Sequence, residues 1–520
     1  MIIEFPEYAP DIAPLNSPGM TSITNAIPDR THYSGIRQLT SYSNALTAYC
    51  RGFYAGKNPQ TGAPIYFAGD ETKLYSLQQA LVSNISKVGG YALADGEYWT
   101  FAQYGNYVIA VNIDGDMQSY VIGTSSVFAN LTADATKPYA RHVDVVGNFV
   151  VVGNTYDTTD NFAPYRVRWS WFDNPTRWTV DAANQSDYQD LDGGNGWVNG
   201  IIGGEFGIIF QERAITTMHY VGSPAVFEFK TVEQNNGTIF PNCFAVVGNI
   251  VYFIGIDGFY SFDGYSATSI GVNKVDKTFF ANINLAFVHR VTAAVDYEKK
   301  VIAFSYPDFN SDNIGTPNQV LYYNYAEKRW GAGTFDHEIL INIYSEGYVM
   351  DPAAATNGLD LWQTGVQGLG AADLDQLPYS LDSRIWTDNK YELAAFNESH
   401  EVATFDGLPQ TALFYTPEVQ LNDGQRTQLS RLRAIVDGNY GTRTVQIGYR
   451  NLQSETVAYT GSFFEMANGD IPVRTAGSNA RYQRLRMQIA FEGTATNPSF
   501  TPFENAIGVE ILEQRKAGKR

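Results

Sequence analysis

The chain has 520 residues, of which 44% are hydrophobic and 17% are charged, and it contains 34 Tyr and 31 Phe. This length allows a large core, and a composition rich in aromatic residues excludes a disordered chain and disfavours a long helical bundle. The formal net charge of −19 argues against wrapping of nucleic acid on a basic surface. It is compatible either with plain solubility or with a passage through which DNA slides without sticking.

The first 40 residues are predicted to form an extended arm, suited to lying along a partner. They contain prolines at positions 6, 10, 14, 18 and 28, which argue against a long helix and a central strand. The opening residues, MIIEFPEYAPDIAP, lack the basic start and the apolar run of a secretory signal, so no export signal is expected. The longest apolar run, VNGIIGGEFGIIF, is too short to span a bilayer and contains Glu205, so no membrane-spanning segment is expected.

One hairpin pattern recurs within residues 41–405. In VVGNIVYFIGIDGFYSFDG (246–264), an apolar run is followed by a two-residue turn at Asp257 and Gly258, a second extended run, and another turn at Asp263 and Gly264. Such turns need positive φ, which Asp tolerates and Gly adopts without steric penalty. Related stretches are PIYFAGDETKLYSL from Pro64, YGNYVIAVNIDGDMQSY from Tyr104, VGNFVVVGNTYD from Val146, GGEFGIIFQERAITTMHYVG from Gly203 and YEKKVIAFSYP from Tyr297.

The spacing of these stretches predicts a β-propeller. Their starts lie roughly 40 to 60 residues apart, and about four short strands per unit without helical interludes are typical of propeller blades, whose faces are buried by neighbouring blades. We expect six or seven blades in residues 41–405, with an irregular last portion around MDPAAATNGLDLW. In YNYAEKRW (323–330), we expect a solvated turn at Ala326 and Glu327 and a tryptophan that packs on the adjoining blade.

Longer alternating strands follow the repeats. A separate β-sandwich-like module is predicted in residues 406–512 from the stretches TALFYTPEVQL, RLRAIVDG, TVQIGYRN and RYQRLRMQIAF. Residues 513–520 collect Arg515, Lys516, Lys519 and Arg520 and are expected to form a solvated basic tail, with contact to DNA or to an acidic subunit as the alternative. The predicted fold class is therefore all-β, with an N-terminal arm, a propeller and a C-terminal β module.

No catalytic, cofactor-binding or metal-binding residue is predicted. The six histidines lack the spacing of a zinc site, and Cys50 and Cys243 lie in the apolar or aromatic surroundings of small buried residues. Two distant thiols cannot form a disulfide framework, which is consistent with folding in a reducing compartment. The acidic stretches DGDMQS and YSFDGYSA lack a full set of calcium ligands. DLDGGNGWVNGIIGG (190–204) lacks the Gly-Lys-Ser/Thr ending of a phosphate-binding loop and is expected to be a mobile loop between blades.

SWFDNPTRW (170–178) is the stretch closest to a catalytic motif. It is similar to the Asp-box turn of sialidase-like propellers, but the Asp spacing is off by one, Pro175 replaces a glycine, and the motif occurs once. We favour a structural turn capped by Asp173 and rigidified by Pro175. A propeller glycosidase that uses paired carboxylates stays open as an alternative, as does a propeller that binds a host glycan or host protein without cleaving it.

Several short strings, taken in order, resemble one protein family. They are RVRWSWFDNPTRWT (166–179), NQSDYQDL (184–191), IIFQERAI (208–215), DGFYSFDG (257–264), VDKTFF (275–280) and YNYAEKRW (323–330). Together with RYQRLRM and the basic terminus, they resemble the tail nozzle, or packaged-DNA stabilisation, proteins of short-tailed bacteriophages and related prophages. The resemblance covers most of the chain and depends on order and spacing, because each string alone is weakly specific.

The resemblance implies a structural virion protein without enzymatic activity and without a cofactor. A protein of this family would be made in the host cytoplasm and would assemble in the virion tail as a homo-oligomeric ring, expected to be a hexamer, below the portal and adaptor. Its other partners would be tail proteins such as a fibre or needle. It would extend the channel for double-stranded DNA, retain the packaged genome and allow its ejection, with no sequence-specific contact.

Overall fold

The computed structural model describes residues 1–13, 19–78, 80–344, 349–351, 359–363, 366–371, 391–422, 425–437, 442–473, 480–490, 503 and 505–517. Nearly all of the elements in this part of the chain are β-strands in antiparallel sheets, which confirms the all-β class. The described helices are α1 (Asp276–Asn282) and two short 3-10 helices, Gly193–Asn195 and Leu285–Arg290. None of the described helices has the length and apolarity needed to cross a membrane.

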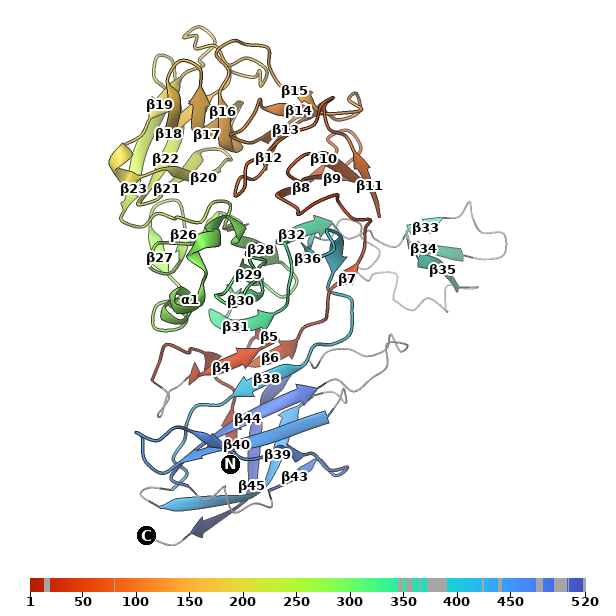
Figure 1. Ribbon diagram of the computed structural model, residues 1–520, viewed down its shortest axis with the longest axis vertical. Coiled ribbons are helices and arrows are strands. Elements are labelled where there is room, and N and C mark those ends of the chain that lie inside the picture. Colours follow the sequence, from red (N-terminus) through yellow and green to blue (C-terminus); the bar gives the residue numbers. More distant parts are fainter. Residues whose placement is uncertain are drawn as a thin grey trace.

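The upper module in Figure 1 consists of successive sets of four antiparallel strands, which we number sheets 1 to 7. Sheets 1 to 3 are β8 (Gly52–Lys57), β9 (Pro64–Gly69), β10 (Leu74–Gln78) and β11 (Leu81–Asn84); β12 (Thr100–Tyr104), β13 (Tyr107–Val111), β14 (Gln118–Val121) and β15 (Ala129–Asn130); and β16 (Tyr139–Val146), β17 (Phe149–Asp157), β18 (Asn161–Trp169) and β19 (Tyr188–Asp190). Sheets 4 and 5 are β20 (Val198–Ile202), β21 (Gly207–Gln211), β22 (Ala214–Gly222) and β23 (Val226–Gln234); and β24 (Phe244–Val247), β25 (Ile250–Ile254), β26 (Phe259–Phe262) and β27 (Ala267–Ser269).

The last two sets depart from this simple order. Sheet 6 contains β28 (Thr292–Asp296), β29 (Val301–Tyr306), β30 (Gln319–Asn324) and β31 (Arg329–Thr334), and it continues into further strands. Sheet 7 contains β32 (Ile339–Tyr344), β36 (Tyr391–Phe396) and β37 (Val402–Thr404), and its fourth strand is β7 (Thr40–Ser41), from the other end of the upper module's sequence. Between β32 and β36, a small sheet of β33 (Val349–Asp351), β34 (Leu359–Gln363) and β35 (Val366–Ala371) projects sideways in Figure 1. Much of the stretch MDPAAATNGLDLW lies outside the described residues.

The hairpin that joins the first two strands of a sheet explains the repeated sequence pattern. In sheets 2, 3 and 5, this turn has two residues, Gly and then Asn, between paired strand ends. The glycines Gly105, Gly147 and Gly248 have φ of 56°, 55° and 60°. A glycine with positive φ at the first turn position is typical of the type II′ hairpin, whose twist matches that of the flanking strands. In these three sheets, the Gly-Asn pair therefore forms the first hairpin.

Each sheet buries its faces against its neighbours. The first strands are in contact in the order β8, β12, β16 and β20, then β24, β28 and β32, and β32 contacts β8. Between sheets 4 and 5, Gly200 of β20 lies against the ring of Phe244 of β24. Shared apolar clusters join Phe67 with Val108, Ala102 with Val143, Val151 with Ile209, Ile208 with Val251, Tyr252 with Tyr323, Ala303 with Leu340, and Ile341 with Tyr75. Every pair of successive sheets, and the pair of sheets 7 and 1, therefore shares a core.

The C-terminal module consists of two packed sheets. Its strands are β38 (Ala412–Tyr415), β39 (Arg426–Val436), β40 (Thr442–Arg450), β41 (Ala458–Tyr459), β42 (Phe463–Phe464), β43 (Asp470–Pro472), β44 (Tyr482–Ala490) and β45 (Ala506–Ala517). Leu432 of β39 and Met487 of β44 meet in one apolar cluster from opposite sheets. Because β45 runs to Ala517 and pairs with β39, the residues Arg515 and Lys516 belong to this strand and not to a separate tail.

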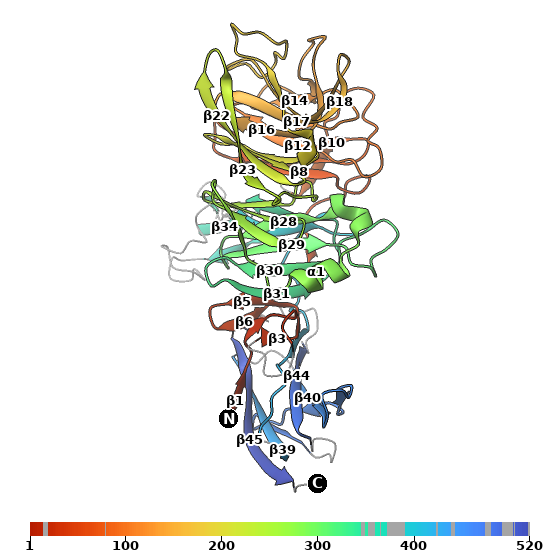
Figure 2. The same cartoon turned by 90° about the vertical axis from the view of Figure 1, so that its left-hand side faces the viewer.

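Most of the N-terminal residues lie between the two modules, while the first strand lies beside the C-terminal module (Figure 2). They form β1 (Ile2–Glu4), β2 (Glu7–Tyr8), β3 (Gly19–Met20), β4 (Ser22–Thr24), β5 (Ala26–Asp29) and β6 (His32–Gly35). Strand β1 pairs with β45 and β4 pairs with β38, while the hairpin of β5 and β6 lies between β31 and β45. Within this chain, the segment expected to be an arm is thus bound to the chain's own modules.

Strand β5 contradicts the prediction that the N-terminal prolines exclude a central strand. It has neighbours on both sides, β31 and β6, although Pro28 lies within it. The pairing with β31 is a single bridge, Ala332 with Ala26, so the missing N–H of Pro28 is not needed there. A side chain on Gly331 would meet the Pro28 ring at 2.7 Å, so the glycine makes room for the ring.

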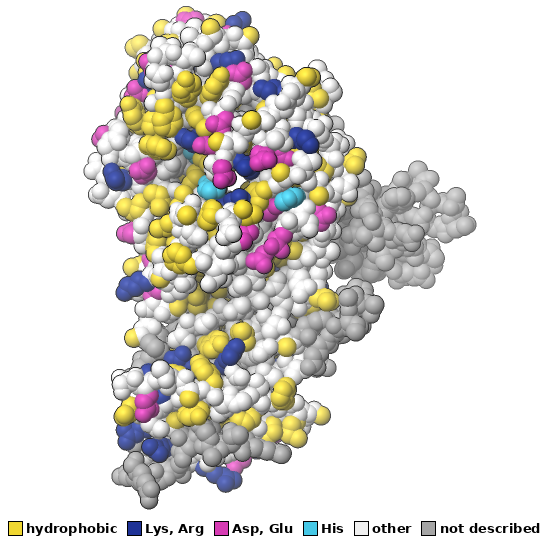
Figure 3. All heavy atoms as spheres, in the orientation of Figure 1, with side chains coloured by type: hydrophobic (Ala, Val, Ile, Leu, Met, Phe, Trp, Pro, Cys, Tyr) yellow, Lys and Arg dark blue, Asp and Glu magenta, His cyan; other side chains and the backbone are white. Residues whose placement is uncertain are grey.

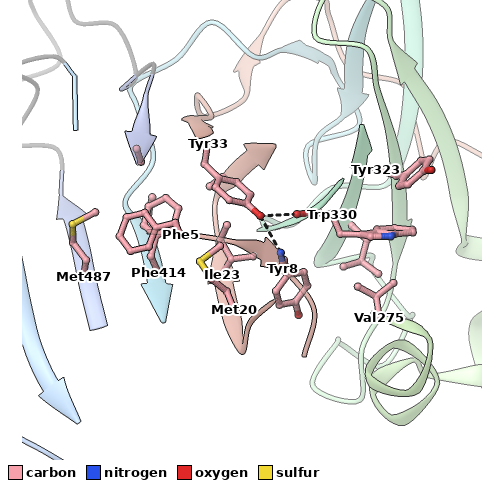
Figure 4. Close-up of a cluster of buried hydrophobic side chains, with 14 of the residues drawn as sticks. Phe5, Tyr8, Met20, Ile23, Tyr33, Val275, Tyr323, Trp330, Phe414 and Met487 are labelled. Atoms are coloured by element: carbon pink, nitrogen blue, oxygen red, sulfur yellow. Dashed lines mark hydrogen bonds between the residues drawn. The ribbon is translucent and has the colours of Figure 1, made fainter. Parts of the chain in front are cut away.

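Figure 4 shows the cluster that joins the N-terminal segment to both modules. The ring of Phe5 stacks on Phe414 of β38 at a centroid distance of 4.7 Å. The Tyr33 hydroxyl accepts a hydrogen bond from the Tyr8 N–H at 3.0 Å and lies 3.1 Å from the Trp330 carbonyl oxygen, to which it can donate. Burial raises the pKa of Tyr33 to about 12. The N-terminal segment therefore connects sheet 6 to the C-terminal module through buried contacts.

Candidate functional site

The turn at Asp257 and Gly258 differs from the prediction. Residues 255–258 form a four-residue loop between paired Ile254 and Phe259, and neither Asp257 nor Gly258 has positive φ. Glycine is required at 258 for another reason: a Cβ there would lie 2.6 Å from the Asp276 carboxylate, which accepts a hydrogen bond from the Phe259 N–H at 3.1 Å. Gly258 therefore allows α1 to pack closely against sheet 5 and is not part of a tight two-residue turn.

The second turn, at Asp263 and Gly264, has the geometry expected of its residues. Gly264 has φ of 96°. The Asp263 carboxylate accepts hydrogen bonds from the N–H groups of Tyr265 at 2.9 Å and Ser266 at 2.8 Å. These backbone hydrogen bonds hold the pKa of Asp263 below its usual value. The Asp263 N–H also donates to the Ser266 carbonyl oxygen, so the residue stabilises the turn through its side chain and its backbone.

Asp173 and Pro175 lie in a turn, but Asp173 does not cap it. The Asn174 side chain accepts hydrogen bonds from the N–H and hydroxyl of Thr176, while Asp173 has φ of 54° and accepts the Tyr104 hydroxyl of sheet 2 at 2.6 Å. The Pro175 carbonyl accepts from the indole N–H of the fully buried Trp178. The turn therefore locks sheet 3 to sheet 2.

The two cysteines are confirmed as free, buried residues. Burial raises the pKa of both thiols, and the Cys50 thiol donates to the Gly52 carbonyl oxygen, so neither is poised as a thiolate nucleophile. His142 and His337 are also buried, which lowers their pKa to about 3 and about 4. Within the described residues, no three His, Cys, Asp or Glu side chains come together as metal ligands would.

Other predictions have clear outcomes. Glu327 is exposed, and the turn before it is held by the Asn324 side chain, which confirms a solvated turn. Trp330 is buried and its ring lies 4.9 Å from that of Phe259 in sheet 5, which confirms its packing on the adjoining sheet. The glycine-rich stretch 190–204 is not a loop throughout, because it contains the 3-10 helix Gly193–Asn195 and the whole of β20.

A pocket of about 360 Å³ lies where sheets 1, 2, 6 and 7 converge, and we call it the inner pocket. Its polar rim comes from segments that lead into first strands: residues 49–51 before β8, 95–99 before β12, 289–290 before β28 and Glu338 before β32. Its lining also includes the aromatic residues Tyr54, Trp99 and Phe101. Figure 3 shows histidine and charged side chains gathered near the middle of the upper module on the face that it draws.

Most charged groups at the inner pocket already have partners. Glu97 is bound by the Arg141 guanidinium, with Nε at 3.0 Å, and Arg51 pairs with Glu71 at 3.1 Å. The buried Glu338 accepts a hydrogen bond from the Cys50 N–H at 2.9 Å and contacts the imidazole of His400. Burial raises the pKa of Glu338. These pairs fix the rim and leave few groups free for a ligand.

Arg290 is the exception among the cations of the rim. Its guanidinium lies over the Tyr49 ring, 3.4 Å from the centroid, but its Nε and Nη1 atoms are buried and have no hydrogen-bond partner in the described structure. Sequence inspection missed this residue, because Arg290 stands in no motif and its isolation depends on loops from four sheets.

A scan of the chain against protein-family models gives no match, and a search of curated proteins finds no relative.

Proposed function

We propose that this chain is a structural, non-enzymatic component of a bacteriophage tail, of the nozzle type, that assembles as a homo-oligomeric ring and extends the DNA channel below the portal and adaptor. The observation that carries the proposal is the ordered set of strings that resemble that family. In the structure, these strings fall on β18, β19, β21 with β22, β26, α1 and β30 with β31. They supply buried packing residues such as Trp178 and Trp330, as a structural role requires.

We further propose that sheets 1 to 7 form a closed seven-bladed propeller. This proposal is supported by the sequence of contacts among first strands, by the core that sheet 7 shares with sheet 1, and by the use of β7 to complete sheet 7. A closed ring leaves no unpaired sheet between first and last blade, which gives a stiff building block for an assembly. A stiff subunit suits a tail component that holds DNA under pressure.

The charge distribution supports a passage for DNA and not a wrapping surface. Residues 1–405 contain 43 Asp and Glu against 22 Lys and Arg, whereas residues 406–520 contain 11 against 13. The acidic excess therefore belongs to the N-terminal 405 residues, and Asp and Glu are prominent over the upper module in Figure 3. Repulsion of phosphates by an acidic surface would let a duplex slide without binding.

Electron microscopy of the purified chain, with size-exclusion chromatography and light scattering, tests the tail assignment. We expect ring-shaped particles with sixfold symmetry and a central opening in end-on views. Particles that stay monomeric at all concentrations, together with absence of the protein from virion tails of a phage that encodes it, would overturn the proposal. A monomer that still joins tails when adaptor is present would retain the assignment and contradict self-assembly.

A further inference from the structure

We propose that the inner pocket binds a small hydroxylated carboxylate of monosaccharide size, a sugar acid, with Arg290 as the contact for its carboxylate. This site is independent of the tail assignment. The geometry points to it through the cavity, the unpaired cation at its wall and the few remaining free polar groups of the rim.

The unpaired state of Arg290 is the first step of the argument. A buried cation is costly unless a counter-ion and hydrogen bonds compensate it. Arg290 has the Tyr49 ring on one side, but it forms no ion pair or hydrogen bond with any described residue, and two of its nitrogens are shielded from water. Burial lowers the pKa of Arg290 to about 10, so the group is still charged at neutral pH. Because Arg290 as a whole is only partly buried, an anion in the pocket would pair with the part of its guanidinium that stays exposed.

The neighbouring acids do not fill this role. Glu338 is occupied by the Cys50 N–H and by His400, and Asp312 accepts from the N–H and hydroxyl of Thr316. Both attract Arg290 electrostatically without reaching it as an ion pair. Glu97 is held by Arg141. Asp95, the remaining acid of the pocket lining, forms no ion pair with Arg290 in the described structure, so an anion that pairs with Arg290 has to come from a ligand.

The size and walls of the pocket select the class of anion. About 360 Å³ is at the small end of the range of ligand pockets and suits a single sugar ring. Tyr54 and Phe101, whose ring centroids lie 6.3 Å apart, line the pocket with aromatic surface, on which the apolar face of a pyranose can lie. Asp95 and His289 line the same pocket and make no hydrogen bond in the described structure, so they are available to bind hydroxyl groups. A bare inorganic anion would leave these walls and groups unused.

Isothermal titration calorimetry with D-glucuronate as the probe tests the site. D-glucose is its neutral counterpart, and acetate and inorganic phosphate test whether any anion suffices. We expect saturable binding of glucuronate at one site, with binding of glucose, acetate and phosphate at least about tenfold weaker, because charge-assisted hydrogen bonds and ring contacts are both required. Equal binding of phosphate or acetate would overturn the sugar-acid class, and no binding of glucuronate would overturn the site.

Arg290→Gln keeps the length of the side chain and removes its charge. We expect it to weaken glucuronate binding by at least about tenfold, whereas Arg290→Lys should retain part of it. The control is Arg177→Gln, which removes an arginine that also lies over an aromatic ring, that of Trp171, and that does not line the pocket; unlike Arg290, Arg177 pairs with an acid, Asp134, at 3.0 Å. Unchanged affinity in Arg290→Gln would overturn the role of Arg290.

A second measurement separates loss of binding from loss of folding. Because Arg290 is only partly buried and forms no ion pair in the described structure, Arg290→Gln should melt close to the temperature of the wild type in the absence of ligand, while the rise in melting temperature that glucuronate causes disappears. A variant that melts well below the wild type without ligand would contradict the view that Arg290 is uncompensated.

Discussion

Thr40 and Thr404 are backbone partners in an antiparallel pair, although one precedes the first sheet of the upper module and the other ends the last. The pair belongs to β7 and β37, and the Tyr42 N–H donates to the Val402 carbonyl oxygen at 2.7 Å just beyond it. Sheet 7 is thus completed by a strand from the start of the chain. Strand β7 therefore ties the segment that leads into sheet 1 to the edge of sheet 7.

The Gly-Asn turns give a test of local backbone conformation. Gly248→Ala should destabilise the protein by about 1–2 kcal/mol, because φ is 60° and an added Cβ disfavours that conformation. Space is not the cause, since nothing lies within 4 Å of a Cβ built there. Gly461→Ala is the matched control, because that position is equally open but lacks positive φ, so urea unfolding should show no loss. Equal stability of the two variants would contradict the turn assignment.

The Tyr33 hydroxyl gives a test of the connection between modules. Tyr33→Phe should reduce the free energy of unfolding by about 1–3 kcal/mol, because it leaves the buried Tyr8 N–H without an acceptor. The variant keeps the ring and its packing on Phe414. As a control, Tyr265→Phe removes the hydroxyl of a side chain that is 83% exposed and should change little. Thermal melting of both variants decides whether the buried hydroxyl matters.

The raised pKa of Asp276 predicts that the stability of the protein depends on pH. Burial raises its pKa to about 6, from a usual value near 3.8, with Asp11 and Asp257 adding to the rise. A carboxyl whose pKa is higher in the folded state favours folding when protonated, so its contribution is complete below about pH 3.8 and is lost as the pH rises through 6. Because the group is partly exposed, we expect a loss of only about 1 kcal/mol.

Asp276→Asn isolates this effect. Urea midpoints of the wild type and the variant should be compared at pH 4, 5, 6 and 7. The amide oxygen of Asn can still accept from the Phe259 N–H, so the variant should lose less stability than the wild type between pH 4 and 7. Parallel curves for the two proteins would show that Asp276 does not titrate in this interval.

The sequence predicts the repeated sheets because their signal is local. Apolar runs broken by turn residues identify the strands, although the hairpins at Gly147 and Gly248 turn on Gly-Asn pairs and not on the Asp-Gly pairs of the prediction. The Asp-Gly pair at 257–258 is not the turn signal that was expected. A glycine is needed at 258 because a side chain there would collide with the carboxylate of Asp276, which is distant in sequence. The periodicity of the sequence predicts the secondary-structure elements, whereas contacts between elements explain why a particular residue type, such as glycine at 258, is needed.

Features built from distant segments could not be predicted. Helix α1 has no capping side chain of its own; Asp11 accepts hydrogen bonds from the N–H groups of Lys277 and Thr278 and caps it from the N-terminal segment. The N-terminal prolines suggested an arm because nothing local indicates that β5 finds a neighbour in β31. Likewise, the sequence does not show that Arg290 lacks an ion-pair partner, because this depends on which neighbouring acids, such as Glu338 and Asp312, are already bound by other residues.

The most direct test of the proposed closed arrangement of sheets is a disulfide between β7 and β37. Thr40→Cys with Thr404→Cys places two thiols at paired positions, where Cβ atoms lie about 4.5–5.5 Å apart, and the native Cys50 and Cys243 are buried and do not compete. Oxidation of the purified double variant should give a cross-link within one chain, seen on a non-reducing gel, and a gain of about 2–4 kcal/mol in stability that a reductant reverses. Either single variant serves as the control. A double variant that stays reduced, or that links only two separate chains, would contradict closure of the sheets within one subunit.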